Sequence, residues 1–197
     1  MKKNNVYAII PAAGSSSRFG NENKLLLCIN GKTIIRRVIE TIIESDIKYA
    51  VVVTGCYRTD IENIIISEKI GYVYNTCWES GMGCSISAGM KFLSKKFDLQ
   101  INDGIMIQNA DMPFVKTATV NLIIKYFFES DKLITAPKFK NITGHPVIFN
   151  TIFSKELSEL SGDHGGKKII KSQKDKICFV KIQSNEIIAD IDYKNFS

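Results

Sequence analysis

The sequence is poor in the residues that build disulfide frameworks and zinc sites. Its five cysteines form no CxxC pair, and its two histidines, His145 and His164, lie far apart in the chain. Disulfide-rich scaffolds and structural zinc sites need closer spacing of these residues. The spacing therefore favours reduced thiols, and we expect a cytoplasmic protein.

Long hydrophobic runs and blocks of like charge are also missing. The longest apolar stretches, such as residues 6–13, are far shorter than the roughly 20 residues of a membrane-spanning helix. The run after Lys2 and Lys3 stops at Pro11, which is too early for a secretion signal. The net charge of +6 comes from lysines scattered along the chain, whereas nucleic-acid surfaces cluster their charge. We expect neither a membrane nor a nucleic acid as partner.

Strand-like and helix-like segments alternate along the chain, and 45% of the residues are hydrophobic, enough for a core. Helical spacing is clear after Thr33, a candidate N-cap. The alternation predicts an α/β fold with a mostly parallel sheet, and the less regular last third favours an antiparallel strand within it. Because no linker or repeat interrupts the chain, residues 1–197 are predicted to form a single domain. We expect strands at residues 6–11, 49–54, 71–75, 104–110, 146–149, 177–182 and 187–192, and helices at residues 33–46, 60–70, 85–96 and 116–128.

Ligands of open parallel sheets bind beyond the carboxyl ends of the strands. The first such segment, residues 11–24, combines glycines, three serines, Arg18 and Lys24. Glycines permit a tight turn, and hydroxyls, free amides and the two cations suit the oxygens of a phosphate. Neither a Walker A loop nor a GxGxxG fingerprint aligns with this segment. The alternative is an ordinary turn with solvated charges.

Two further segments follow predicted strands. Asp111 stands between the strand at 104–110 and Pro113, where a carboxylate is a good ligand for Mg²⁺ but would serve equally as a helix cap or Asx turn. Gly81 and Gly83 precede a predicted helix whose N-terminus suits an anion or a nucleobase, although the missing third glycine makes this signal weak.

Together these segments resemble the MobA-like nucleotidyltransferases, and most closely the molybdenum cofactor cytidylyltransferase branch. The resemblance runs in order from about residue 6 to 192. Its motifs are Ile10-Pro-Ala-Ala-Gly-Ser-Ser-Ser-Arg-Phe-Gly20 with Lys24, then Asn75, Trp78, Gly81 and Ser85, then Asp111-Met-Pro-Phe114, Gly144-His-Pro-Val-Ile-Phe149, Gly162-Asp-His-Gly-Gly166 and Asp190-Ile-Asp192. It implies a Rossmann-like three-layer α/β/α nucleotidyltransferase domain.

The resemblance also implies an activity: transfer of CMP from CTP to the phosphate of a molybdopterin-type acceptor, with release of pyrophosphate and dependence on Mg²⁺. A molybdenum hydroxylase is then the candidate recipient of the product. Such transfers depend on alignment and charge neutralisation. We expect Lys24, Arg18 and Asp111 to be catalytic, with Asp111 and Asp192 on the metal and Asp190 as a further candidate ligand.

The binding residues are carried over from the same motifs. The nucleotide is expected at Pro11, Ala12, Ala13, Gly14, Ser15, Ser16, Arg18, Lys24, Asn75, Gly81 and Ser85. The acceptor is expected at His145 and Asp163, whose alternatives are a strand-end histidine and a turn aspartate.

Some points stay open. CTP is favoured because the opening reads Pro-Ala-Ala-Gly, whereas the guanylyl branch typically reads Leu-Ala-Gly-Gly. The sequence departs from relatives after Asp192, where Tyr193 replaces the start of a Thr-Pro-Glu-Asp motif, and at Cys28, where proline is usual. The alternative functions are a nucleotidyltransferase for a sugar phosphate or another small phosphorylated alcohol, and a non-catalytic chaperone that delivers the cofactor.

Overall fold

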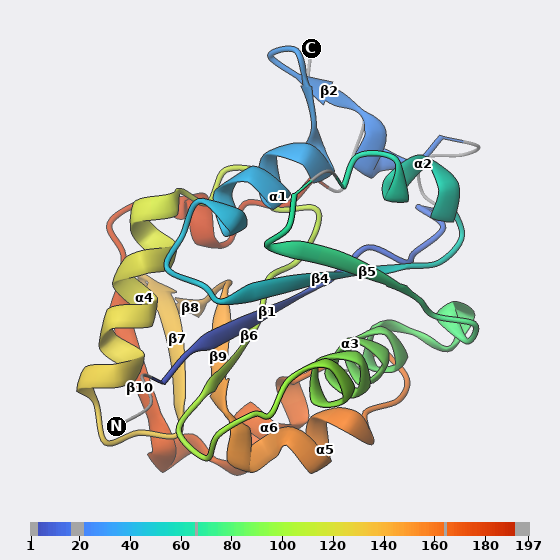
Figure 1. The fold of residues 1–197 in the computed structure, drawn as a ribbon. Helices are drawn as coiled ribbons and strands as arrows, with labels where there is room; N and C mark the ends of the chain where they lie inside the picture. Colours follow the sequence, from blue (N-terminus) through green and yellow to red (C-terminus); the bar gives the residue numbers. More distant parts are fainter. Residues whose placement is uncertain (1–3, 17–21, 66, 164, 192–197) are drawn as a thin grey trace.

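A central sheet organises the computed structural model, which describes residues 4–16, 22–65, 67–163 and 165–191. Within that part of the chain the strand order is β10–β7–β9–β6–β1–β4–β5, with β8 paired to β7 (Figure 1). All pairs among β6, β1, β4 and β5 are parallel, as is β7 with β10, and β9 runs antiparallel to both β6 and β7. This confirms a mostly parallel sheet with an antiparallel member. The strands are β1 (Val6–Pro11), β4 (Tyr49–Thr54), β5 (Ile70–Tyr74), β6 (Gly104–Ile107), β7 (Ile134–Phe139), β8 (Ile142–Thr143), β9 (Val147–Asn150) and β10 (Ile177–Lys181).

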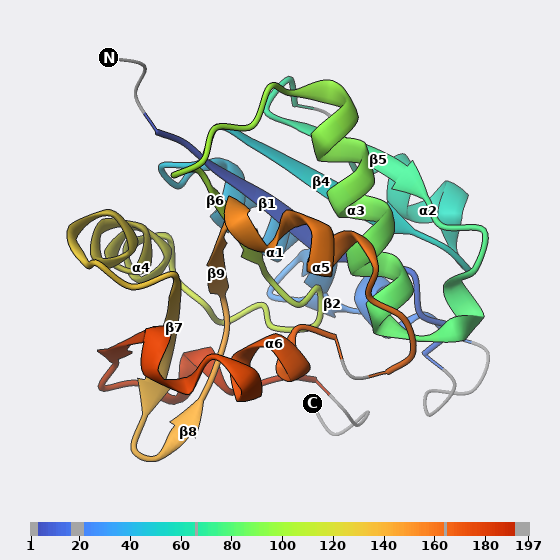
Figure 2. The ribbon, with the colours of Figure 1, turned by 90° about the horizontal axis from the view of Figure 1, so that it is seen from below.

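Helices cover both faces of the sheet, so the molecule has three layers (Figures 1 and 2). On one face, α1, α2 and α4 bury side chains such as Ile35, Ile61 and Phe127 against the strands. On the other face, α3, α5 and α6 bury Met90 and Ile169. The expected α/β/α architecture is therefore confirmed. The helices are α1 (Ile34–Ile43), α2 (Arg58–Glu62), α3 (Met82–Lys96), α4 (Thr117–Glu129), α5 (Ser154–Ser158) and α6 (Lys167–Ser172).

Two predicted elements are wrong. The helix predicted at 60–70 is only α2, which ends at Glu62, and Ile70 already begins β5. The isoleucines that follow Asn63 are β-branched and favour helix poorly. The strand predicted at 187–192 is not formed by its described residues, because a 3₁₀ turn occupies Asn185–Ile187 and no strand follows it up to residue 191.

The loops after β1 and β4 are joined where these neighbouring parallel strands end. The Ala12 N–H donates to the carbonyl of Val53 at 2.9 Å, and the Cys56 N–H donates to the carbonyl of Ala13 at 3.1 Å. Gly55 lies against these hydrogen-bonded loops, and a Cβ at this position would overlap the Ala13 carbonyl. The first loop is thus fixed at its base and carries its polar residues beyond the edge of the sheet. Among the helices of the described residues, none is long and apolar enough to cross a membrane.

Candidate functional site

The first loop closes on itself through side-chain oxygens. The Ser16 hydroxyl accepts a hydrogen bond from the Lys24 N–H at 3.2 Å and donates to Asn23 Oδ1, also at 3.2 Å. Asn23 caps the short 3₁₀ helix Lys24–Leu26 by accepting from the Leu25 N–H. A Cβ built at Gly14 meets no heavy atom within 4 Å, so the loop faces open space there. Arg18, which was predicted to be catalytic and to bind the nucleotide, lies outside the described residues.

Lys24 and Asp111 meet across the site. The Lys24 Nζ and Asp111 Oδ2 atoms are 2.6 Å apart, and the two side chains keep only 17% and 23% of their surface exposed. Lys24 comes from the loop after β1, and Asp111 comes from the loop after β6, the strand beside β1. The structure thus brings together two of the three residues predicted to be catalytic, in one partly desolvated ion pair.

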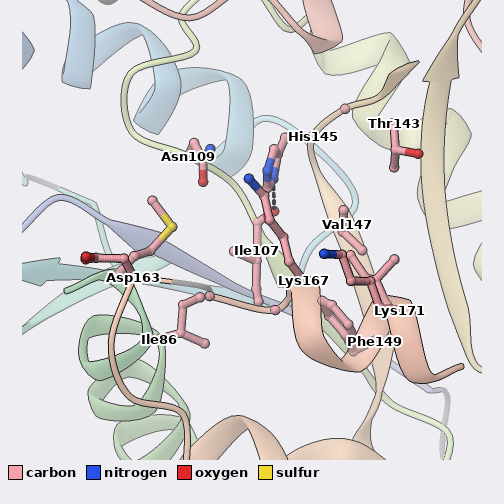
Figure 3. A pocket seen from close by; sticks show the side chains of 15 residues that line it. Ile86, Ile107, Asn109, Thr143, His145, Val147, Phe149, Asp163, Lys167 and Lys171 are labelled. Carbon is pink, nitrogen blue, oxygen red and sulfur yellow. Dashed lines mark hydrogen bonds between the residues drawn. The ribbon is translucent and has the colours of Figure 1, made fainter. Parts of the chain in front are cut away.

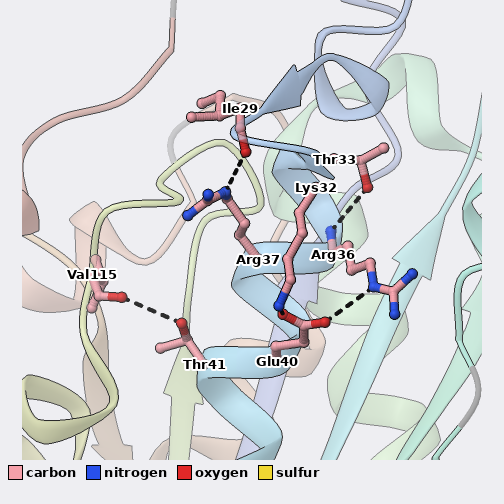
Figure 4. A network of polar contacts seen from close by, with 8 residues as sticks. All are labelled: Ile29, Lys32, Thr33, Arg36, Arg37, Glu40, Thr41 and Val115. Carbon is pink, nitrogen blue, oxygen red and sulfur yellow. Dashed lines mark hydrogen bonds and ion pairs between the residues drawn. The ribbon is translucent and has the colours of Figure 1, made fainter.

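A polar network holds the segment after Lys24 to helix α1 (Figure 4). The β2–β3 hairpin (Cys28–Ile29 and Lys32–Thr33) packs on α1, and Arg37 donates from Nε to the Ile29 carbonyl at 3.0 Å. Lys32 and Arg36 both bind Glu40, at 2.6 and 3.0 Å. The hydrogen bond from Lys32, followed by that from Arg36, lowers the pKa of Glu40. Exposed pairs of this kind contribute little to stability. The Lys32–Glu40 pair links the hairpin to α1, whereas the Arg36–Glu40 pair lies within α1.

The C-terminal segment runs beside Asp111. The Ile191 N–H donates to the Asp111 carbonyl at 3.1 Å, and the Ile191 side chain is only 1% exposed. The exposed Asp190 therefore lies in the segment next to Asp111, whereas Asp192 falls outside the described residues.

The surroundings of Asp111 fit a divalent cation that the substrate helps to bind. Mg²⁺ takes one or two carboxylates and completes its shell with phosphate oxygens and water. A carboxylate has two oxygens, so Asp111 can accept from Lys24 and still offer an oxygen to a metal. In the described ranges no three His, Cys, Asp or Glu side chains gather into a preformed metal site. An ion here would depend on Asp111, a neighbouring carboxylate and the nucleotide.

The second segment is shaped by buried contacts. Asn75 Nδ2 donates to Ser85 Oγ at 3.1 Å, and Asn75 Oδ1 accepts from the Cys77 N–H. Both side chains are buried, with 5% and 4% of their surface exposed. These two residues, predicted to bind the nucleotide, are therefore paired with each other and set the course of the segment. Gly81 has a φ of +97°, and a Cβ there would overlap Asp163 Oδ1.

A pocket of about 280 Å³ opens between β6, β9, α3 and α6 (Figure 3). His145 and Asp163, the two predicted acceptor residues, both line it. His145 Nδ1 lies 3.3 Å from the Ile107 carbonyl. Loss of hydration is the main influence on this ring and lowers the pKa of His145, and the Lys167 charge acts in the same direction. The hydrogen bond to Ile107 and the Asp111 charge oppose that shift.

The sequence reasoning missed four polar residues of this pocket: Asn109, Thr143, Lys167 and Lys171. Asn109 Oδ1 is buried and has no hydrogen-bond partner in the described part of the chain. The lysines stand four positions apart on α6, with Ile169 buried between them. Their spacing after Gly165 and Gly166 indicates a helix with one basic edge, but it does not show that this edge faces a pocket.

Comparison with known proteins identifies relatives along almost the whole chain. Residues 8–177 match the family described as the MobA-like NTP transferase domain. The chain is 29% identical over 185 residues to a probable molybdenum cofactor guanylyltransferase of Thermococcus sibiricus, covering 89% of this chain and 85% of the relative.

Solved structures agree on the fold. A nucleotidyl transferase from Methanothermobacter thermautotrophicus superposes with a TM-score of 0.79 at 18% identity, covering 97% of this chain and 93% of the other. Rv0371c from Mycobacterium tuberculosis, in complex with manganese, superposes with a TM-score of 0.73 at 18% identity, covering 91% of this chain and 89% of the other.

Proposed function

The chain belongs to the MobA-like NTP transferase domain family, and from this premise we propose that it transfers a nucleoside monophosphate to a molybdopterin-type acceptor. The donor is an NTP, the acceptor group is the terminal phosphate, and pyrophosphate is released. The ion pair between Lys24 and Asp111 carries the proposal, because it places a cation and a hard carboxylate beside the loop that suits phosphates. The molybdenum cofactor guanylyltransferase among the relatives supports this acceptor.

The reaction places several negative charges close together. An oxygen of the acceptor phosphate forms a bond to the α-phosphorus, the bond from that phosphorus to the bridging oxygen breaks, and pyrophosphate leaves with the electron pair. A phosphate is already ionised at neutral pH, so no general base is required. Lys24 then neutralises charge that develops on the α-phosphate. A divalent ion on Asp111 would supply Lewis-acid stabilisation of the same group.

The acceptor belongs in the pocket that His145 and Asp163 line. This pocket has an apolar body, formed by residues such as Ile86, Val147 and Phe149, with polar groups at its rim. Such a lining suits a flat heterocycle that carries polar substituents. A molybdenum hydroxylase is the proposed recipient of the product.

For the donor we propose CTP, because of the Pro11-Ala12-Ala13-Gly14 opening. The Ala13 side chain is buried and lies beside Gly55, where it helps to fix the course of the loop. GTP is the competing donor, and the name of the Thermococcus relative favours it.

Pyrophosphate release tests both assignments. The protein would be incubated with molybdopterin, Mg²⁺ and either CTP or GTP, and pyrophosphate would be measured over time. Faster release from CTP supports the donor assignment, whereas faster or equal release from GTP contradicts it. No release with either nucleotide contradicts the acceptor, and release with a sugar phosphate in place of molybdopterin would show a different one. Nucleotide binding without turnover by any acceptor would indicate the non-catalytic alternative.

A further inference from the structure

Two lysines of α6 line the acceptor pocket. Lys167 and Lys171 extend from the same side of the helix into the space where His145 lies (Figure 3). In the described ranges neither ammonium group forms an ion pair with a carboxylate. Asp163 is the one acidic residue among the residues that line the pocket. The pocket therefore holds more positive than negative charge before any ligand binds.

The local fold keeps these lysines at the pocket. Gly166, directly before α6, lies close to the Phe149 ring, because a Cβ there would come within 2.9 Å of Phe149 Cζ. The Ile169 side chain is buried on the same helix. Residues three and four apart share one face of a helix, so Lys167 and Lys171 are neighbours, whereas Lys168, also on α6, does not line the pocket.

The pocket that Lys167 and Lys171 line lies next to the proposed site of transfer at Lys24 and Asp111. Asn109 lines the pocket and stands two residues before Asp111. His145 lines the same pocket as Lys167, and its Nδ1 atom lies 3.3 Å from the carbonyl of Ile107, the last residue of the strand that precedes Asp111. Asn109 Oδ1, buried and without a partner in the described residues, offers an acceptor to an N–H group of a ligand.

We propose that Lys167, with help from Lys171, binds the phosphate of the acceptor. In this position the acceptor phosphate faces the α-phosphate of the nucleotide, which lies beside Lys24 and Asp111. The inference rests on the proposed function and narrows its substrate to phosphate monoesters. Two phosphate groups repel each other as they approach, so each needs its own cation: Lys24 serves the donor, and Lys167 serves the nucleophile. An acceptor with a free hydroxyl in place of the phosphate leaves these lysines unpaired and is a poor substrate.

The test compares Lys167→Met and Lys171→Met with Lys168→Met, a matched change on the neighbouring residue of the same helix. We expect Lys167→Met to raise the KM for the acceptor about tenfold or more, since a charged hydrogen bond is lost. Lys171→Met should have a smaller effect, and the KM for the nucleotide should stay within about twofold in both. Lys167→Arg should recover most of the affinity, because it restores the charge. Lys167→Met that behaves like Lys168→Met overturns the proposal.

A second measurement does not depend on turnover. Inorganic phosphate would be titrated into protein saturated with nucleotide in the absence of metal, and binding would be followed by NMR. Weaker binding in Lys167→Met than in Lys168→Met supports the proposal, and equal binding contradicts it. Failure of the wild-type protein to use molybdopterin would refute the proposed function alone, because the phosphate titration still decides the role of Lys167.

Discussion

The proposed nucleotide side and the proposed acceptor side of the candidate site differ in how their charged side chains are paired. On the nucleotide side, Lys24 is paired with Asp111 at 2.6 Å, and Ser16 and Asn23 hydrogen-bond to each other. On the acceptor side, Lys167 and Lys171 have no ion-pair partner within the described residues, and Asn109 Oδ1 is buried without a donor. Among the described residues, the nucleotide side pairs its lysine with a carboxylate, and the acceptor side leaves its two lysines without such a pair.

This difference indicates how each side meets its ligand. A preformed ion pair keeps Lys24 in place, so its orientation costs little when the nucleotide arrives. A pocket whose lysines have no carboxylate partner attracts an anion, and its lysines form charge-assisted hydrogen bonds only when that anion binds. We expect changes on the nucleotide side to act mainly on the rate of the chemical step, and changes on the acceptor side to act mainly on affinity.

Breaking the ion pair should have the largest effect. We expect Asp111→Asn and Lys24→Met each to lower kcat by roughly 10²-fold or more, since Lys24 is proposed to neutralise the α-phosphate and Asp111 to hold both Lys24 and the divalent ion in place. The measurement is pyrophosphate release at saturating nucleotide and acceptor. Lys125→Met is the control, because Lys125 forms a remote, exposed pair with Glu129 on α4. A kcat loss below about threefold in both variants would contradict the expectation that the nucleotide side acts mainly on the rate of the chemical step.

Much of the fold was predictable because the strongest signals were local. Continuous apolar runs gave β1 and β4 with their observed bounds, since both strands are buried on both faces. Thr33 caps α1 by accepting from the Arg36 N–H, as its place before an amphipathic stretch indicated. β7 was missed, because Pro137 and flanking lysines interrupt its apolar pattern. The C-terminal segment resembles a strand in sequence, yet it is fixed by long-range contacts, such as that of Ile191 with Asp111.

The candidate site was predictable where a loop follows a strand, and less so where packing decides. Lys24 and Asp111 were found because neighbouring parallel strands end at one edge of the sheet. Asn75 and Ser85 stay predicted to bind the nucleotide, and the structure adds that they are buried and hydrogen-bonded to each other, a contact that no local pattern reveals. Lys167 and Lys171 were missed because α6 gains a direction only when Gly166 packs on Phe149.

An effect of intermediate size is expected when Gly81, which lies beside Asp163, is replaced by alanine. Gly81→Ala should lower the free energy of unfolding by about 1–3 kcal/mol, because its φ of +97° strains an L-residue and its Cβ would overlap Asp163. It should also raise the KM for the acceptor, since Asp163 lines the pocket. Gly14→Ala is the control for stability, because space is open around it and its φ is not positive. Equal urea midpoints for the two variants would contradict this view of the Gly81–Asp163 contact.

The smallest expected effect is the pH dependence that His145 gives to stability. Partial burial lowers the pKa of His145 in the folded protein below its ordinary value of 6.5. The unfolded chain then binds more protons between the folded pKa and 6.5, so stability rises with pH through this window and is complete above it. His145→Gln should reduce the slope of the unfolding free energy against pH, by at most about 1.4 kcal/mol per pH unit for one proton. Urea unfolding of both proteins at pH 5, 6, 7 and 8 measures the difference, and parallel curves would show that His145 gains its proton as readily in the fold as in water.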